Sequence, residues 1–231
     1  MNTATIKKLL RNFPIFKDLS EYELDPIVDL AKHRVYPNGT HIFMQGDPLT
    51  NVYFIHDGQV KIYRTDMHGK EQIVNVLRPG EMFPHQGFFR QDDYPAHAEA
   101  LGDIVLVYIP IHSFETFLIT HPEICIKLFR VLGDIIVDLQ NRLREQILHN
   151  TYEQIIMLLL RLTNTHAEQI DDQQYRFTTQ FTNRELANMI GSSRETVSRT
   201  LTELKNKKCL MTDANHHMVI FKDKLESEMS Y

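Results

Sequence analysis

Apolar residues change their spacing along this 231-residue chain, and each change marks a new part of the predicted fold. Helix is predicted within residues 1–31, because Ser20 and Glu23 have capping-box spacing and apolar residues follow them at helical intervals. From Arg34 onward this spacing gives way to short apolar runs between glycines. The strands predicted in that stretch are His41–Gln45, Val52–His56, Gln59–Thr65, Lys70–Leu77 and Ile104–Ile109.

Two glycine-containing dipeptides, Asp57-Gly58 and His68-Gly69, stand between these runs where hairpin turns are expected. Many short strands at this spacing are typical of a β-sandwich or a jelly-roll barrel. We therefore predict a barrel of this kind, after which helical signals return at Ser113 and again after Pro122.

A long helix is predicted from Glu123 to about His149, because apolar residues recur there at helical intervals. Such a stripe could be buried in a core or could form a coiled-coil seam with a second copy. We favour the seam, because a stripe that continues so far past a small barrel has little else to pack on. A second apolar helix over 151–162 and a polar break over 163–174 follow. The stripe comprises Ile124, Leu128, Val131, Leu132, Ile135, Ile136, Leu139, Leu143 and Ile147.

The C-terminal third predicts two short helices around a tight turn. Thr182 with Glu185, and Ser192 with Glu195, have the capping-box spacing that starts a helix. Gly191 can adopt a positive φ and so can end the first of the two helices sharply. This arrangement is a helix–turn–helix.

The second of these helices has one apolar face and one polar face. The apolar face carries Val197, Leu201 and Leu204, which must contact a core. A recognition helix places such a polar face in the DNA major groove, where Arg bonds guanine and Glu accepts from cytosine. A helical hairpin that never touches DNA is the alternative interpretation. The polar face carries Arg194, Glu195, Ser198, Arg199 and Thr202.

Two further runs, Cys209–Thr212 and His216–Phe221, flank a short polar turn and predict a hairpin of the winged-helix type. Residues 181–210 contain six basic and three acidic residues, although the whole chain has a net charge of −5. Such a local excess is expected of a DNA-facing patch on an acidic protein, although a solvated helix face can show it too.

Composition narrows the remaining classes of function. The sequence has no apolar run of 18 residues and its polar N-terminus has no signal-peptide core, so we expect no membrane association. Two cysteines fit a reducing cytoplasm, and the cytoplasm is the expected location. We expect no enzyme activity, because the chain has no His-x-His pair, nucleophile elbow, phosphate loop or Cys-x-x-Cys motif.

The run Gly191-Ser192-Ser193-Arg194-Glu195-Thr196-Val197-Ser198-Arg199 closely resembles the recognition-helix motif of the CRP/FNR family of bacterial transcription regulators. The order of predicted elements is similar to that family along nearly the whole chain. The resemblance implies an α+β fold with three parts. These are a cupin-like β-barrel (jelly-roll) effector domain over 1–122, a dimerisation helix over 123–149, and a winged helix–turn–helix domain over 150–231.

By the same resemblance, Arg194, Glu195 and Arg199 occupy base-contacting positions, and Ser198 matches a further base-contacting position in the FNR branch. The implied partner is double-stranded DNA with palindromic, TGTGA-like half-sites, bound by a homodimer that works with RNA polymerase. A ligand-binding barrel that acts as a signalling adaptor without DNA is the alternative function.

The resemblance fails at the sensor. Cyclic-nucleotide-binding members hold the phosphate with an Arg followed by Ser or Thr, whereas Tyr94 and Pro95 stand at those positions here. Glu81 still matches the ribose-binding acid of those members. We therefore expect operator binding without a cyclic nucleotide and assign no cofactor.

Other sensor chemistries stay open as alternatives. A haem could be ligated by His85 or His97, although a His in a polar loop is more often simply solvated. Cys125 could form a redox-sensitive bridge, although a buried and inert Cys is more common. A four-cysteine iron–sulfur cluster is excluded, because the chain has only Cys125 and Cys209.

Overall fold

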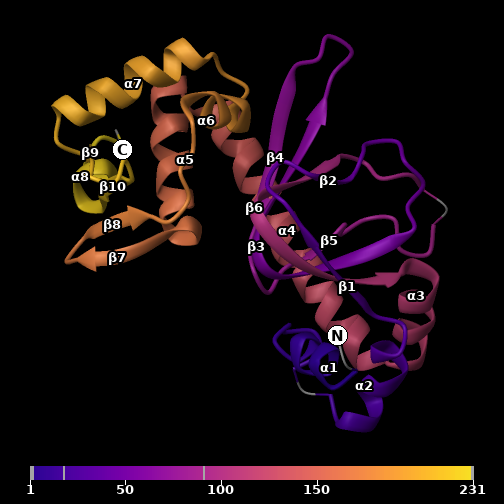
Figure 1. The fold of residues 1–231 in the computed structure, drawn as a ribbon. Coiled ribbons are helices and arrows are strands. Elements are labelled where there is room, and N and C mark those ends of the chain that lie inside the picture. Colours follow the sequence, from indigo (N-terminus) through magenta and orange to yellow (C-terminus); the bar gives the residue numbers. More distant parts are fainter. Residues whose placement is uncertain (1–2, 18, 91, 230–231) are drawn as a thin grey trace. The chain divides into compact units, whose positions relative to one another are not determined.

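The computed structural model describes residues 3–17, 19–90 and 92–229. The chain forms two compact units, Met1–Ile136 and Val137–Tyr231. Figure 1 shows the elements of both units along the chain. Within the described residues no helix is both long enough and apolar enough to cross a membrane.

The first unit begins with two helices, α1 (Thr3–Leu10) and α2 (Glu21–Val28). The capping box predicted at the start of α2 is confirmed, because the side chains of Ser20 and Glu23 each accept from the other's backbone N–H. Residues 1, 2 and 18 of the predicted helical stretch lie outside the described residues. Two more helices follow the strands of this unit, α3 (Ile111–Thr120) and α4 (Pro122–Leu148).

Six strands of the first unit form one antiparallel sheet in the order β1-β6-β3-β4, with β2 paired to β6 and β5 paired to β3. The predicted β-rich domain is therefore confirmed as an antiparallel sheet with helices packed against it. The strands are β1 (Lys32–Tyr36), β2 (His41–Phe43), β3 (Asn51–Thr65), β4 (Glu71–Leu77), β5 (Met82–Phe83) and β6 (His97–Pro110).

One predicted turn is wrong. Asp57-Gly58 lies inside the single strand β3, where the pairing with β6 shifts register, so the two strands predicted on either side are one. Gly58 has φ +80°, and a Cβ at this position would lie 2.5 Å from the side chain of Ile104. One type of β-bulge places a glycine at positive φ, as the common hairpin turns do, so the local sequence fits both. The turn predicted at His68-Gly69 is confirmed.

Neighbouring residues on the strands point to opposite faces of the sheet, as the period of two requires. Tyr53 and Phe83 belong to an interior cluster that is rich in aromatic rings. Phe54 and Met82 belong instead to the cluster that the sheet shares with α1, α2, α3 and the start of α4. The first unit therefore has two apolar cores, one on each face of β3 and β5.

The second unit contains the end of α4, four more helices and a four-stranded antiparallel sheet in the order β7-β8-β10-β9. Apolar side chains of α5, α6, α7 and α8 form its core with Phe177 and Ile220. The elements are α5 (Thr151–His166), β7 (Ala167–Asp171), β8 (Gln174–Phe177), α6 (Asn183–Ile190), α7 (Arg194–Asn206), β9 (Leu210–Thr212), β10 (Met218–Phe221) and α8 (Lys222–Ser227).

The polar break predicted over 163–174 is wrong as well. The structure extends α5 to His166 and then forms the β7–β8 hairpin. Four of the five residues of β7 are exposed, so this strand has no buried face that would give an alternating apolar pattern. The hairpin predicted after the helix–turn–helix is confirmed, and its two strands are β9 and β10.

Candidate nucleic-acid interface

The helix–turn–helix begins where the sequence predicts it. Thr182 caps α6, and its side chain and that of Glu185 satisfy each other's backbone N–H groups. Gly191 ends the helix in the left-handed region, with φ +70°, and its N–H bonds the carbonyl of Ala187. The tight turn between α6 and α7 therefore follows from local chemistry.

The start of α7 differs from the prediction by one residue. Ser193 rather than Ser192 is the N-cap, and its hydroxyl accepts from the backbone N–H of Thr196 at 3.1 Å. Glu195 is consequently the second residue of the helix and is not the partner of a reciprocal capping box. Both serines can cap a helix, so the pairing of Ser192 with Glu195 by spacing alone selected the wrong one.

This shift leaves the Glu195 carboxylate exposed at the positive end of the helix dipole. Hydrogen bonds from its own backbone N–H and from Ser193 hold the pKa of this carboxyl below its ordinary value. Arg194 and Arg199 lower it further through their charges. Glu195 is therefore ionised at neutral pH and can accept a hydrogen bond from an external donor.

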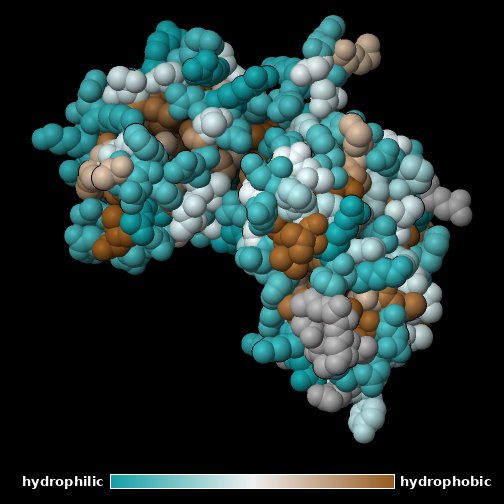
Figure 2. All heavy atoms as spheres, viewed as in Figure 1, coloured by the Kyte–Doolittle hydropathy of each residue, from teal (hydrophilic) through white to brown (hydrophobic). Residues whose placement is uncertain are grey.

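The two faces of α7 separate as predicted. Val197, Leu201 and Leu204 are buried in the core of the second unit. Arg194, Glu195 and Arg199 are exposed on the opposite side, and Figure 2 shows a mostly hydrophilic surface over α7. Ser198 is half-buried, and its carbonyl accepts a 2.9 Å hydrogen bond from the Thr202 hydroxyl. The structure thus brings all four predicted site residues to one side of a 13-residue helix.

One cation near this helix has an internal role that the sequence does not indicate. The Lys207 ammonium lies 2.6 Å from Glu228, 3.0 Å from the Tyr152 hydroxyl and 3.1 Å from Glu203. The Tyr152 hydroxyl also donates to Glu228 at 2.8 Å. These contacts tie the end of α7 to the start of α5 and to the residue after α8. Glu203 lies four residues before Lys207 and is the only local indication of this cluster, because Tyr152 and Glu228 are distant in sequence.

Tyr94 and Pro95, at the positions that the resemblance assigns to phosphate binding, have structural roles. Tyr94 is buried and stacks on Phe43, with ring centroids 3.7 Å apart. Its hydroxyl accepts from the backbone N–H of Asn51 at 3.1 Å. Pro95 accepts from Arg64 through its carbonyl at 2.9 Å. The interior at this position is filled by aromatic rings.

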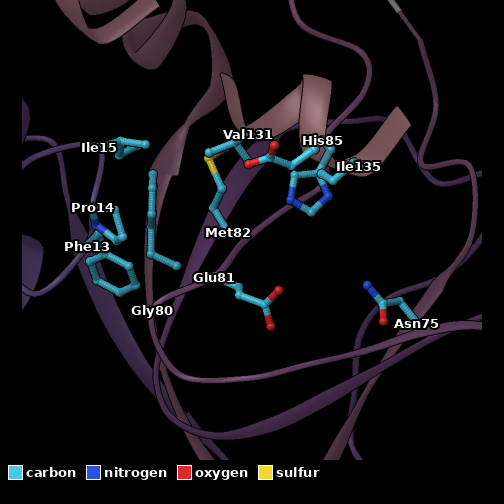
Figure 3. Close-up of a pocket in the computed structure, with 12 residues that line it drawn as sticks. Phe13, Pro14, Ile15, Asn75, Gly80, Glu81, Met82, His85, Val131 and Ile135 are labelled. Carbon is cyan, nitrogen blue, oxygen red and sulfur yellow. The ribbon is translucent and has the colours of Figure 1, made fainter. Parts of the chain in front are cut away.

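The candidate sensor residues lie apart on the structure. His97 stacks on Tyr63 and accepts from the backbone N–H of Gln45. Its neighbour Ala98 faces the aromatic interior, so His97 points to the other face of β6. His85 lines a separate cavity (Figure 3). The Cys125 thiol is half-buried and donates to the carbonyl of Leu118.

Comparisons with known proteins agree with this architecture. A family model described as a cyclic nucleotide-binding domain matches residues 33–121, and one described as a Crp-like helix-turn-helix domain matches residues 153–226. Among solved structures, FixK2 from Bradyrhizobium japonicum superposes with a TM-score of 0.75 at 20% identity, over 87% of this chain and 98% of that one. A CooA mutant from Carboxydothermus hydrogenoformans has the same TM-score at 18% identity, over 96% and 95% of the two chains. At these identities the likeness shows the fold.

Sequence relatives extend the agreement to function. The chain is 27% identical to the CRP-like cAMP-activated global transcriptional regulator of Mycobacterium tuberculosis, over 74% of this chain and 76% of the relative. It is also 27% identical to the cyclic AMP receptor protein of Thermus thermophilus, over 84% and 87% of the two chains. Regulators of this kind bind DNA and typically act as dimers, and the match to the Crp-like domain argues against an adaptor that has no contact with DNA. From the fold, the exposed recognition helix and these matches it follows that the chain is a DNA-binding transcription regulator of the CRP/FNR family.

Proposed function

We propose that this regulator binds a palindromic operator as a dimer and that it needs no cyclic nucleotide to do so. The exposed, ionised Glu195 beside Arg194 and Arg199 on α7 is the observation that carries the proposal. Glu195 accepts from cytosine N4, Arg199 forks onto guanine O6 and N7, and Arg194 and Ser198 complete the contact surface. These contacts fix a G·C pair in each TGTGA-like half-site.

Dimerisation through α4 is supported by the apolar residues that this helix leaves uncovered. Ile124 and Leu128, at its start, are buried in the first unit. Further along α4, a different set of apolar side chains is more than half exposed. Together with Gly133 and Gln140, these residues recur at alternating intervals of three and four residues. This is the heptad spacing of a two-stranded coiled coil. The exposed set is Ile126, Phe129, Ile136, Leu143 and Ile147.

The predicted apolar stripe of α4 is divided between a core and an exposed face. Ile126 and Phe129 on that face were not part of the predicted stripe, whereas Val131 and Leu132 of the stripe pack against the core. Its first turns belong to a core, and the heptad positions are free for a second copy. Leu139 is half exposed but lies beside the heptad positions, so we assign it to the flank of the seam. Two copies joined in this way present their recognition helices about 34 Å apart, in successive major grooves.

Independence from cyclic nucleotides is supported by the aromatic interior. Tyr94 and Pro95 supply no charge to a cyclic phosphate, and Pro95 has no N–H to donate. The stacked rings of Tyr94 and Phe43 occupy the interior at this position. Burial of an unpaired phosphate there is costly. Cyclic AMP appears in the names of two relatives, and those names describe the relatives only. We do not assign cyclic AMP binding to this chain.

The remaining partners follow from the same proposal. A regulator bound to its operator acts on transcription by RNA polymerase, and a bacterial chromosome places both proteins in the cytoplasm. We assign no catalytic activity and no resident cofactor. Among the described residues there is no group of three or more His, Cys, Asp or Glu side chains that could hold a metal ion.

Binding-site selection from random duplex DNA tests the proposal directly. The purified protein, with no added nucleotide, is expected to enrich palindromes with TGTGA-like half-sites. Isothermal titration with cyclic AMP and cyclic GMP is expected to give no heat of binding at micromolar affinity. Enrichment of single half-sites, or operator binding only after cyclic AMP is added, would contradict the corresponding part of the proposal.

A further inference from the structure

A cavity of about 270 Å³ lies in the first unit, between the segment after α1, the region around β5, and α4 (Figure 3). Most of its wall is apolar and includes the rings of Phe13 and Phe54. The cavity is slightly smaller than typical ligand pockets, which suits a small molecule. Its polar lining residues are Asn75, Glu81, His85 and Asp134.

This cavity is separate from the aromatic interior described above. Neither Tyr94 nor Pro95 lines it, whereas Glu81 does. Aromatic rings thus fill the interior around Tyr94, whereas an open space lies beside Glu81. A ligand of this space meets a carboxylate and never meets a phosphate-binding group.

Polar atoms in the cavity wall are available to a ligand. One oxygen of Glu81 accepts from the backbone N–H of Arg78 at 2.6 Å, and the other has no hydrogen-bond partner within the part of the chain that the structure describes. The same holds for the ring nitrogens of His85. Figure 3 shows the Glu81 carboxylate, the Asn75 amide and the His85 ring directed toward one open space.

The charges around this space are unbalanced. Glu81 and Asp134 are acidic, and among the described residues no Lys or Arg lines the cavity. Arg78 forms an ion pair with Glu81 at 3.9 Å from outside the lining, and the two side chains are 42% and 39% exposed. Burial raises the pKa of Glu81, and this effect outweighs the opposing effects of the Arg78 N–H hydrogen bond and of the Arg78 charge. The two carboxylates repel an anionic ligand, whereas a cationic ligand can pair with Glu81.

We propose that this cavity binds a small organic cation, namely a protonated amine whose apolar body lies against Phe13 and Phe54. The ammonium group donates to the free oxygen of Glu81, and the aromatic walls favour a cation as well as an apolar group. Neutral His85 completes the site as a hydrogen-bond partner, because burial lowers its pKa to about 4.

The position of the cavity gives the bound amine a way to influence DNA binding. Val131, Asp134 and Ile135 of α4 form part of its wall. A ligand that contacts α4 stabilises the arrangement of this helix to which it binds most tightly. It therefore increases the fraction of dimers that have this arrangement. This regulatory effect rests on the proposed operator binding, whereas the binding of an amine to the free protein does not.

Benzylamine is a suitable probe, with benzyl alcohol and benzoate as neutral and anionic analogues of the same shape. The full-length protein is titrated with each compound while the ring signals of His85 are followed by NMR, assigned through a His85→Gln variant. We expect saturable binding of benzylamine, weaker binding of benzyl alcohol and no binding of benzoate. Glu81→Gln should weaken benzylamine binding by at least about tenfold, since it removes a charge-assisted hydrogen bond.

Two variants keep the result interpretable. Glu71→Gln removes a carboxylate from β4 that does not line the cavity, and should leave benzylamine affinity unchanged. Ile135→Trp fills the cavity from α4 and should abolish binding. Benzoate binding as tight as benzylamine binding, or unchanged affinity in Glu81→Gln, would overturn the proposal.

Operator affinity is measured separately, first without and then with benzylamine. Operator binding without any amine binding to the free protein would remove the ligand proposal and leave the proposed function standing. Amine binding by a protein that selects no operator would remove the proposed function and leave the ligand proposal standing.

Discussion

Tyr94 lies flat on Phe43 in the aromatic interior of the first unit, with ring centroids 3.7 Å apart and ring planes 6° from parallel. The Tyr94 hydroxyl bonds both the backbone N–H and the carbonyl of Asn51. This packed and hydrogen-bonded ring stands at the position that the family resemblance assigns to a phosphate contact. The stacking and these hydrogen bonds show that Tyr94 contributes to the core of the first unit.

Replacement of Tyr94 by alanine should accordingly destabilise the first unit by about 3–5 kcal/mol, because a large buried aromatic side chain leaves a cavity. Tyr94→Phe keeps the stack and loses the hydroxyl contacts, which include those with Thr50 and Asn51, at a cost of about 1 kcal/mol. Urea denaturation of the two variants measures the difference. Equal stability of both variants would show that the stack contributes little.

Glu195→Ala should weaken binding to the cognate operator by about 1–3 kcal/mol and relax the preference at one base pair. The reason is that the carboxylate is exposed and ionised on the face of α7 that we place in the major groove. Binding-site selection with the variant measures the preference base by base. An unchanged sequence preference would mean that α7 docks in a different orientation.

Lys208 and Lys207 should differ although they are adjacent. Lys208 is exposed, so its replacement by alanine should weaken binding to all DNA sequences. The slope of log affinity against log salt concentration should become shallower by about one. Lys207 is held by Glu228, Tyr152 and Glu203, so Lys207→Ala should change the salt dependence less and loosen the end of α7. Operator affinity measured across a salt series compares the two. The same loss of salt dependence in both variants would show that Lys207 leaves its cluster to contact DNA.

A charge at the proposed seam should separate the dimer. Leu143→Lys places an ammonium group at a heptad position, and a buried, unpaired charge is strongly destabilising. Asn141→Lys is the matched control, because this exposed residue of α4 lies off the heptad positions. Light scattering should give monomers for the first variant and dimers for the second, with operator binding lost only in the first. A Leu143→Lys protein that stays dimeric would place the interface elsewhere. Leu139→Lys, beside the seam, should have an intermediate effect.

Stability should fall in mild acid because of His85. Burial lowers the pKa of its imidazole to about 4, below the value of 6.5 for an unfolded chain. Between these two values the unfolded state binds more protons than the folded state, so stability decreases as the pH falls through this window. The loss from this one group is at most about 2 kcal/mol between pH 7.5 and pH 5. Denaturation curves at both pH values should show this part of the loss in the natural protein and not in His85→Gln. An identical pH dependence of the two proteins would mean that His85 is solvated.

Local sequence determined the elements whose chemistry is complete within a few residues. The capping boxes of Ser20 with Glu23 and of Thr182 with Glu185, and the left-handed Gly191, involve partners three or four positions apart. The apolar face of α7 follows from the helical period in the same way. Because the recognition motif lies within this local range, the family and its DNA-binding role were accessible from the chain alone.

Tertiary structure decided the features whose partners are distant in sequence. Asp57-Gly58 became a bulge because β6 passes beside it, and Lys207 joined a cluster with residues 55 positions before it and 21 after it. The β7–β8 hairpin has no apolar alternation because most of β7 faces solvent. The cavity beside Glu81 and His85 exists only where α4 and the segment after α1 meet the sheet. Helical and turn propensities act over one or two turns of chain, whereas strand partners, ion-pair partners and cavity walls depend on which distant segments the fold brings into contact.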